Sequence, residues 1–144
     1  MKKIVLSTFN ARYTHTSLGL RYLYANLKEY KEDTIIKEFV IKSSVADALE
    51  EILKETPSIV GLGAYIWNAK EISQLTEMLK LVRPDITLIL GGPEASYLPH
   101  RVDFSKADFI IQGEGDVAFY KLCKTLFENK KPSQCFIKAS VVDL

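Results

Sequence analysis

The stretch Ile59-Val60-Gly61-Leu62-Gly63 decides the fold class of this 144-residue chain. It is a short, uninterrupted apolar run, which is typical of a strand that is buried on both faces. Its two glycines let a ligand or another backbone approach closely. Segments with helical spacing of apolar residues lie on both sides of the run. We therefore expect a strand in the middle of a parallel sheet.

Further apolar runs, before and after this stretch, predict the other strands: Ile4–Leu6, Thr34–Val40, Ile86–Leu90 and Phe109–Ile111. Helical stripes separate most of them, and Ser44 with Asp47 resembles a capping box, while Asn68 is expected to cap a later helix. We predict an α/β, flavodoxin-like (Rossmann-like) doubly wound fold with a five-stranded parallel sheet in the order 2-1-3-4-5. The connection 91–107 is expected to be a long loop with one short helical turn.

The domain organisation follows from where this alternation stops. We expect residues 1–129 to form the α/β domain and residues 130–144 to form a C-terminal extension or a linker toward a missing domain. Within that segment, Cys135-Phe136-Ile137 is either an extra edge strand or the start of a linker.

Composition excludes several classes of protein. Nineteen basic and 18 acidic residues give a net charge of +1, without the basic surplus of a nucleic-acid binder. No apolar run approaches the roughly 20 residues of a membrane span, and the start of the chain lacks a secretory core, so a cytoplasmic location is expected. The two cysteines, Cys123 and Cys135, are too few for an iron–sulfur cluster. Cys123 is expected in the core.

Ligands of such sheets bind beyond the carboxyl ends of the strands. The strand ends here lack the acidic residues of a phosphate-accepting receiver and the small, glycine-containing loop of a flavodoxin. The spacing of Gly61 and Gly63 does not continue into a dinucleotide fingerprint, because Ile66 stands where the third glycine belongs. The chain also has no nucleotide-binding Gly-Lys-Ser/Thr loop, no zinc spacing and no nucleophile elbow.

Glycines instead follow two of the later strands, in Gly91-Gly92-Pro93-Glu94 and Gly113-Glu114-Gly115-Asp116. With the glycines of 59–63 they suggest a slot between the sheet and its helices. Aromatic residues on the predicted loops suit a large flat ligand or a partner surface: Phe9, Tyr13, Tyr65, Trp67 and Tyr97. Turn chemistry for the glycines, and a footprint of a neighbouring domain for the aromatics, remain open alternatives.

In order along the chain, these motifs resemble the N-terminal cobalamin-binding domain of cobalamin-dependent radical S-adenosylmethionine (SAM) enzymes. The resemblance rests on the segment 10–23, Asn-Ala-Arg-Tyr-Thr-His-Thr-Ser-Leu-Gly-Leu-Arg-Tyr-Leu, on Ile59–Gly63, on Gly91-Gly92-Pro93-Glu94 and on the segment 108–116. It spans about residues 2–126.

The resemblance implies that a corrinoid binds with its nucleotide tail beside the glycines and its ring over the loops. The implied cofactor-binding residues are Phe9, Asn10, Thr14, His15, Ser17, Leu18, Gly63, Ala64, Tyr65, Trp67, Gly91, Gly92, Pro93, Glu94, Gly113 and Glu114. The segment lacks the Asp-x-His-x-x-Gly motif that supplies a lower-axial histidine in other cobalamin domains. Base-off cobalamin without a histidine ligand is therefore expected, and ligation by His15 is the less favoured alternative. Gly92→Leu is expected to abolish binding with little change in melting.

The chain itself is expected to lack a catalytic site, because it has no Cys-x-x-x-Cys-x-x-Cys motif. The resemblance places a 4Fe-4S cluster and SAM in a missing C-terminal radical SAM barrel, the expected partner, with methyl transfer as the parent reaction. Two other classes stay open. One is a cobalamin-free regulatory domain that binds a small molecule at the same edge, and the other is an inter-domain docking module.

Overall fold

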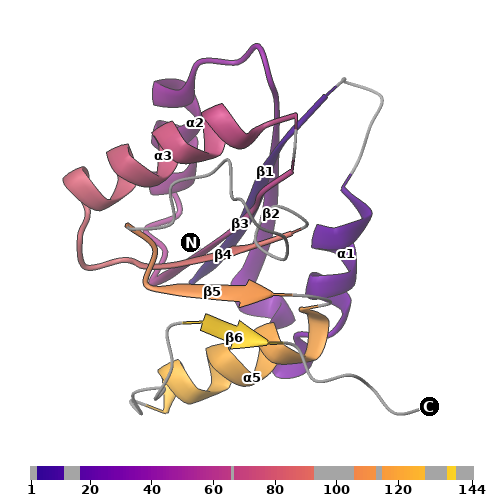
Figure 1. The fold of residues 1–144 in the computed structure, drawn as a ribbon. Helices are drawn as coiled ribbons and strands as arrows, with labels where there is room; N and C mark the ends of the chain where they lie inside the picture. The colour runs from indigo at the N-terminus through magenta and orange to yellow at the C-terminus, as the bar shows by residue number, and fades with distance from the viewer. Residues whose placement is uncertain are drawn as a thin grey trace.

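A computed structural model describes residues 3–11, 17–65, 67–92, 106–112, 115–128 and 136–138 of the chain. Its parallel sheet has the order β2-β1-β3-β4-β5-β6 (Figure 1). The elements are β1 (Ile4–Asn10), α1 (Leu18–Ala25), the 3-10 helix η1 (Lys28–Asp33), β2 (Thr34–Val40), α2 (Val45–Leu53), β3 (Ile59–Gly63), α3 (Ala69–Val82), β4 (Thr87–Gly91), β5 (Phe109–Gln112), α5 (Asp116–Phe127) and β6 (Phe136–Lys138). The predicted order of the first five strands is confirmed.

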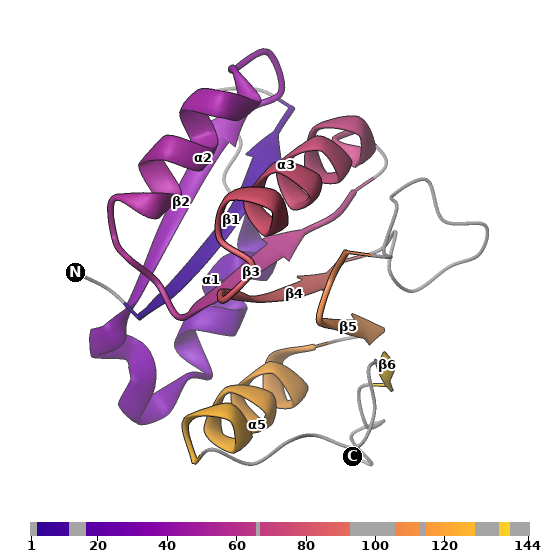
Figure 2. The same cartoon turned by 90° about the vertical axis from the view of Figure 1, so that its left-hand side faces the viewer.

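Helices cover both faces of the sheet, α2 and α3 on one side and α1 and α5 on the other (Figure 2). The side chains of neighbouring residues in a strand point to opposite faces of the sheet, so a strand contributes side chains to the hydrophobic core on each face. Val5, Val60 and Leu62 belong to the core under α2 and α3. Ile4 and Leu6 belong to the core under α1 and α5. This two-sided burial explains why the central strand β3 is a continuous apolar run in the sequence.

Serine side chains fix the starts of two helices. The Ser44 hydroxyl accepts a hydrogen bond from the Asp47 amide at 3.3 Å, as the capping pattern predicted. The Ser17 hydroxyl accepts one from the Leu20 amide at 3.2 Å and begins α1. Both bonds satisfy amides that lack a partner within the helix. Since α1 begins beyond the end of β1, this cap also places the first turn of α1 at the carboxyl edge of the sheet.

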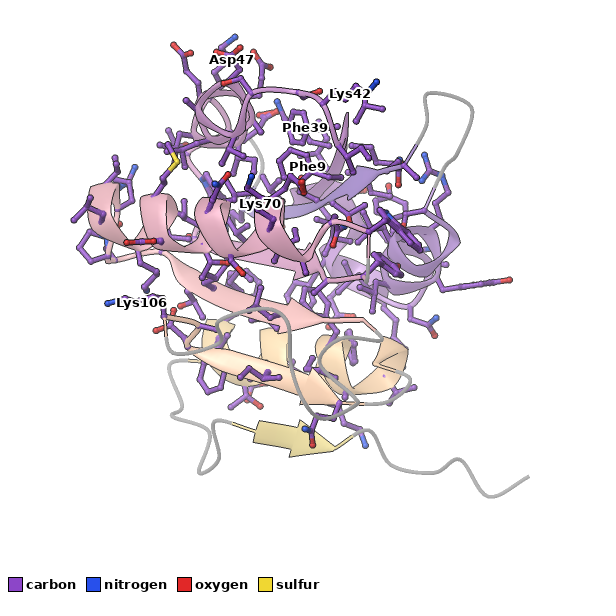
Figure 3. All side chains as sticks on the ribbon, turned by 45° about the horizontal axis from the view of Figure 1, so that its top comes forward. Phe9, Phe39, Lys42, Asp47, Lys70 and Lys106 are labelled. Atoms are coloured by element: carbon purple, nitrogen blue, oxygen red, sulfur yellow. The ribbon has the colours of Figure 1, made fainter. Side chains whose placement is uncertain are left out.

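Strand β1 is longer than the run Ile4–Leu6 predicted, because it continues through four more residues to Asn10. The polar side chains in this extension are buried but hydrogen-bonded: the Ser7 hydroxyl donates to the Lys37 carbonyl at 2.6 Å. The placement of Phe9 in a loop was therefore wrong. Its ring is fully buried, and its centroid lies 5.6 Å from that of the Phe39 ring. Figure 3 labels both side chains.

The C-terminal segment adds a strand rather than only a linker. β6 pairs in parallel with β5, with Ile137 opposite Ile111. Of the two alternatives for this segment, the edge strand is present. The expected helical turn in the fourth connection falls on residues 93–105, which lie outside the described part of the chain. No helix among the described residues is long and apolar enough to cross a membrane.

Candidate functional site

The centre of the sheet's carboxyl edge is a hydrogen-bonded junction between β1 and β3, built around Asn68. Asn68 begins α3, but its side chain makes no capping bond to that helix. Its amide nitrogen instead donates to the Thr8 hydroxyl and to the Phe9 carbonyl, both at 3.0 Å. Its carbonyl oxygen accepts from the Tyr65 amide at 2.8 Å. The fully buried Asn68 therefore joins the two strand ends that flank the point where strand order reverses.

Thr8 completes this junction. Its hydroxyl donates to the Gly63 carbonyl at 2.8 Å while it accepts from Asn68. The buried threonine hydroxyl thus both donates and accepts a hydrogen bond within the protein. Neither Thr8 nor Asn68 was predicted as a site residue, because the hydrogen bonds that join β1 to the loop after β3 link residues more than 50 positions apart. Their arrangement fixes the loop that follows β3.

Two aromatic rings stand on that loop. Tyr65 and Trp67 are stacked, with ring centroids 4.6 Å apart and planes 6° from parallel. The Trp67 indole nitrogen donates to the Phe9 carbonyl at 3.1 Å, which ties the ring to the end of β1. Trp67 nevertheless exposes 46% of its surface. A large, positioned and exposed aromatic face is suited to contact a flat apolar ligand.

The expected glycine slot is filled over β3. A Cβ at Gly61 would lie 3.1 Å from the Phe119 ring and 3.0 Å from Leu6. A Cβ at Gly63 would lie 3.2 Å from Cε2 of Tyr65. These contacts are on the face covered by α1 and α5, where side chains already occupy the space. Side chains therefore occupy the expected slot beside β3, with Phe119 over Gly61 and Tyr65 over Gly63.

Beside β4, the two glycines differ sharply. A Cβ at Gly91 would meet only the Ile111 carbonyl at 3.8 Å, an ordinary contact, so this position has room. Gly92 has φ of +99°, and its Cβ would lie 2.5 Å from the Ala64 carbonyl oxygen. Gly92 is thus needed for the backbone itself. The expectation that Gly92→Leu leaves melting little changed is wrong, because that side chain would strain the turn and collide with β3's end.

Glu38 organises the second part of the edge, at the end of β2. Its carboxylate accepts hydrogen bonds from the Asn10 side chain, from Arg21 and from the Ser17 amide, the last at 3.0 Å. Only 15% of its side chain is exposed. Burial raises the pKa of Glu38, but these hydrogen bonds outweigh it and hold the pKa below its ordinary value of 4.5. The carboxylate therefore fastens the first turn of α1 to the end of β1.

The structure brings only some of the expected site residues together. Gly63, Ala64, Tyr65 and Trp67 lie around the junction, and Gly91 and Gly92 lie next to Ala64. Ala64 is fully buried, and its amide donates to the Gly91 carbonyl at 2.7 Å. Phe9 and Asn10 turn their side chains into the protein, and Leu18 is described only as part of α1. The expected residues outside the described part of the chain are Thr14, His15, Pro93, Glu94, Gly113 and Glu114.

The described residues hold no group of three or more histidine, cysteine, aspartate or glutamate side chains that fits a metal ion. Both histidines of the sequence, at positions 15 and 100, lie outside that part. Cys123 lies in the core as expected, where burial raises the pKa of its thiol to about 12. That thiol is not a nucleophile at neutral pH.

A family model described as "B12 binding domain" matches residues 4–123 of the chain. The chain belongs to the B12-binding domain family. This match covers every element from β1 to the middle of α5, including the junction around Asn68 and the glycines of β3 and β4. The expected family is thereby confirmed, and cobalamin is confirmed as the cofactor for which the family is named.

Two curated relatives share part of the sequence. The cobalamin-dependent radical SAM methyltransferase TokK of Streptomyces tokunonensis is 31% identical over 72 residues, 48% of this chain and 10% of TokK. The 2-(S-pantetheinyl)-carbapenam-3-carboxylate methyltransferase of Streptantibioticus cattleyicolor is 29% identical over 70 residues, 46% of this chain and 10% of that enzyme. The matched region is thus a small part of each relative.

Solved structures share the fold. The cobalamin-dependent SAM radical enzyme OxsB, solved with aqua-cobalamin bound, superposes with a TM-score of 0.71 at 14% identity, over 96% of this chain and 22% of OxsB. A cobalamin-binding protein from Desulfitobacterium hafniense DCB-2 superposes with a TM-score of 0.58 at 20% identity, over 85% of this chain and 57% of that protein. At these identities the likeness establishes the fold.

Proposed function

We propose that this chain binds cobalamin at the carboxyl edge of its sheet, as the corrinoid-binding part of a radical SAM enzyme. The observation that carries the proposal is the exposed Trp67 ring, stacked on Tyr65 and tied to β1 within a B12-binding domain. The ring lies at the strand-order reversal, where α/β sheets bind their ligands. In this reading the corrin ring rests against Trp67 and the loop after β3.

The residues around β4 fit the cofactor better than those around β3. Gly91 leaves an uncrowded position at the end of β4, on the face of the sheet that carries α1 and α5. Gly92 allows a tight backbone turn against Ala64 directly beside it. We place the nucleotide tail along Gly91. Gly61 is a poor candidate for a tail contact, because Phe119 and Leu6 fill its space.

The proposed binding mode is base-off without a protein histidine on cobalt. The segment after β1 has no Asp-x-His-x-x-Gly motif, and a displaced nucleotide tail needs a place beside the sheet. When bound, cobalamin supplies a cobalt centre that carries a methyl group. The chain's own residues would position the corrin and exclude water from its lower face, rather than donate a ligand.

The parent reaction that we propose is radical SAM-dependent and methyltransferase-like, as the names of the matched relatives suggest. The chain spans about a tenth of those relatives. We therefore assign the 4Fe-4S cluster and SAM to a further, C-terminal domain. Since β6 belongs to the sheet, we place the linker to that domain after residue 138 rather than after residue 129.

Absorption spectroscopy tests this function. Purified protein is titrated with hydroxocobalamin, and the expected result is a saturable shift toward a base-off spectrum. Reduction to the cob(II) state then allows electron paramagnetic resonance to detect an axial nitrogen. We expect no splitting of the signal by an axial nitrogen. A nitrogen splitting that is present in the wild type and lost in His15→Ala would establish ligation by His15. No spectral change with folded protein at saturating cobalamin would contradict the function.

A further inference from the structure

The side chain of Tyr65 occupies the space between the end of β3 and the start of α1. Its ring lies over Gly63, where an added Cβ would be 3.2 Å from Cε2. Its hydroxyl reaches the first turn of α1, because an added Cβ at Gly19 would be 3.0 Å from that oxygen. The same hydroxyl lies 3.5 Å from the Ser17 hydroxyl. Tyr65 thus bridges the sheet and α1 at the place where Gly63 and Gly19 leave room for a ring.

The space between the end of β3 and α1 is formed by two glycines, but the protein's own Tyr65 fills it. Gly63 and Gly19 lack side chains on facing elements, which creates a space wide enough for an aromatic group. In the structure that group is Tyr65 itself, held by its stack on Trp67 and by a hydroxyl contact at the outer limit of hydrogen-bond length. Stacking of one aromatic pair is a modest interaction, and within the described part of the chain no charged group contacts the ring.

We infer that Tyr65 selects among corrinoids by their nucleotide tail. A tail that runs along Gly91 also passes Gly63, the register partner of Gly91, and its aromatic base would take the place that the Tyr65 ring fills. This inference rests on the proposed function and adds a residue that sets its specificity. A corrinoid with a tail binds only the conformation in which Tyr65 has turned away. A corrinoid without a tail binds either conformation. The apparent dissociation constant of the tailed ligand is therefore the intrinsic constant divided by the fraction of molecules in which the space is open.

The test compares hydroxocobalamin with diaquocobinamide, a corrinoid that lacks the nucleotide, and uses the ratio of their dissociation constants. Tyr65→Ala empties the space, so cobalamin should gain about tenfold in affinity relative to cobinamide, equivalent to ~1.4 kcal/mol. Tyr65→Phe is the matched control. It keeps the ring over Gly63 and its stack on Trp67, so its ratio should stay within about twofold of the wild-type ratio. Because only the ratio is used, a change in corrin contact common to both ligands cancels.

A measurement on the unaltered protein covers the case in which Tyr65→Ala does not fold. The nuclear Overhauser effect between the Tyr65 ring and the Gly63 α-proton should be present in the free protein and with cobinamide, and absent with cobalamin. An unchanged ratio in Tyr65→Ala, or an Overhauser effect that persists with cobalamin, would overturn the inference alone. Failure of both corrinoids to bind the wild type would instead overturn the proposed function, and the role of Tyr65 with it.

Discussion

The side-chain amide of Asn68 donates a hydrogen bond to the Phe9 carbonyl, 3.0 Å away at the end of β1. The two residues are 59 positions apart, and the same amide also reaches the Thr8 hydroxyl. This one side chain holds together the ends of β1 and β3 and the loop that carries Tyr65 and Trp67. The candidate site is therefore built on a rigid polar junction and not on a free loop.

Asn68→Ala should lower the free energy of unfolding by about 2–3 kcal/mol, because it leaves buried donors and acceptors without partners. Urea denaturation at neutral pH measures the change. Asn26→Ala is the matched control, since the side-chain amide of Asn26 donates an exposed hydrogen bond to the Tyr22 carbonyl. A loss of no more than about 0.5 kcal/mol is expected there. Equal losses in the two variants would show that the junction does not stabilise the fold.

Glu38→Gln should destabilise the protein by about 1–2 kcal/mol at neutral pH, because a carboxylate with three donors becomes a neutral amide. The folded-state pKa of Glu38 is lowered, so its contribution is present above the ordinary value of 4.5 and is lost as the pH falls through the folded-state pKa. The stability difference between wild type and Glu38→Gln should thus shrink as the solution is acidified.

Denaturation curves of both proteins across the acidic range measure that difference. Glu77→Gln removes an exposed glutamate on α3 and is the control for the loss of one negative charge, so at neutral pH it should cost less stability than Glu38→Gln. A gap between wild type and Glu38→Gln that stays constant down to strongly acidic pH would refute the assignment of a lowered pKa to this carboxylate.

Gly91, the last residue of β4, and the following Gly92 differ in the room that they leave for a side chain. Gly92→Ala should cost about 1–3 kcal/mol of stability, because an alanine is strained at positive φ and its Cβ would press on the Ala64 carbonyl. Gly91→Ala should change stability by less than about 1 kcal/mol, since its Cβ makes only an ordinary contact. Thermal melts of the two variants distinguish them. Comparable melting temperatures would contradict the strained turn at Gly92.

Cys123 should resist modification in the folded protein. Its thiol is buried, and burial raises its pKa to about 12, so almost no thiolate exists at neutral pH. In a Cys135→Ser protein, Ellman's reagent should react with Cys123 only at the rate of unfolding. Urea should therefore accelerate the reaction, whereas rapid reaction in native buffer would place the thiol at the surface.

Much of the fold could be predicted because it depends on local patterns. The run Ile59–Gly63 coincides with β3, since a strand buried on both faces leaves a continuous apolar signature. The β-branched and apolar run Thr34–Val40 coincides with β2. The cap at Ser44 was equally local. The extension of β1 could not be read in this way. Its serine, threonine and asparagine are polar, and their burial depends on partners in β2, β3 and α3.

The same distinction separates the predicted parts of the site from the missed ones. Tyr65 and Trp67 could be selected because large aromatics after a strand are unusual in a loop. Glu38 and Asn68 could not, because each is an ordinary polar residue with a deciding partner far away in the sequence: Arg21 is 17 positions from Glu38, and Thr8 is 60 positions from Asn68. The spaces beside Gly61 and Gly63 are filled by Phe119 and Tyr65. These side chains come to the glycines only when the chain folds, so the sequence pattern did not indicate it.

The central claim is that a corrinoid binds beside Trp67 with its tail along Gly91. Trp67 is the single tryptophan of the chain, so its fluorescence reports the site without labelling. Titration with hydroxocobalamin, corrected for absorbance, should give saturable quenching in the wild type. In folded Gly91→Leu the dissociation constant should rise by about tenfold or more, equivalent to ~1.4 kcal/mol. Absence of saturable quenching in the wild type, or equal affinity in Gly91→Leu, would contradict the account.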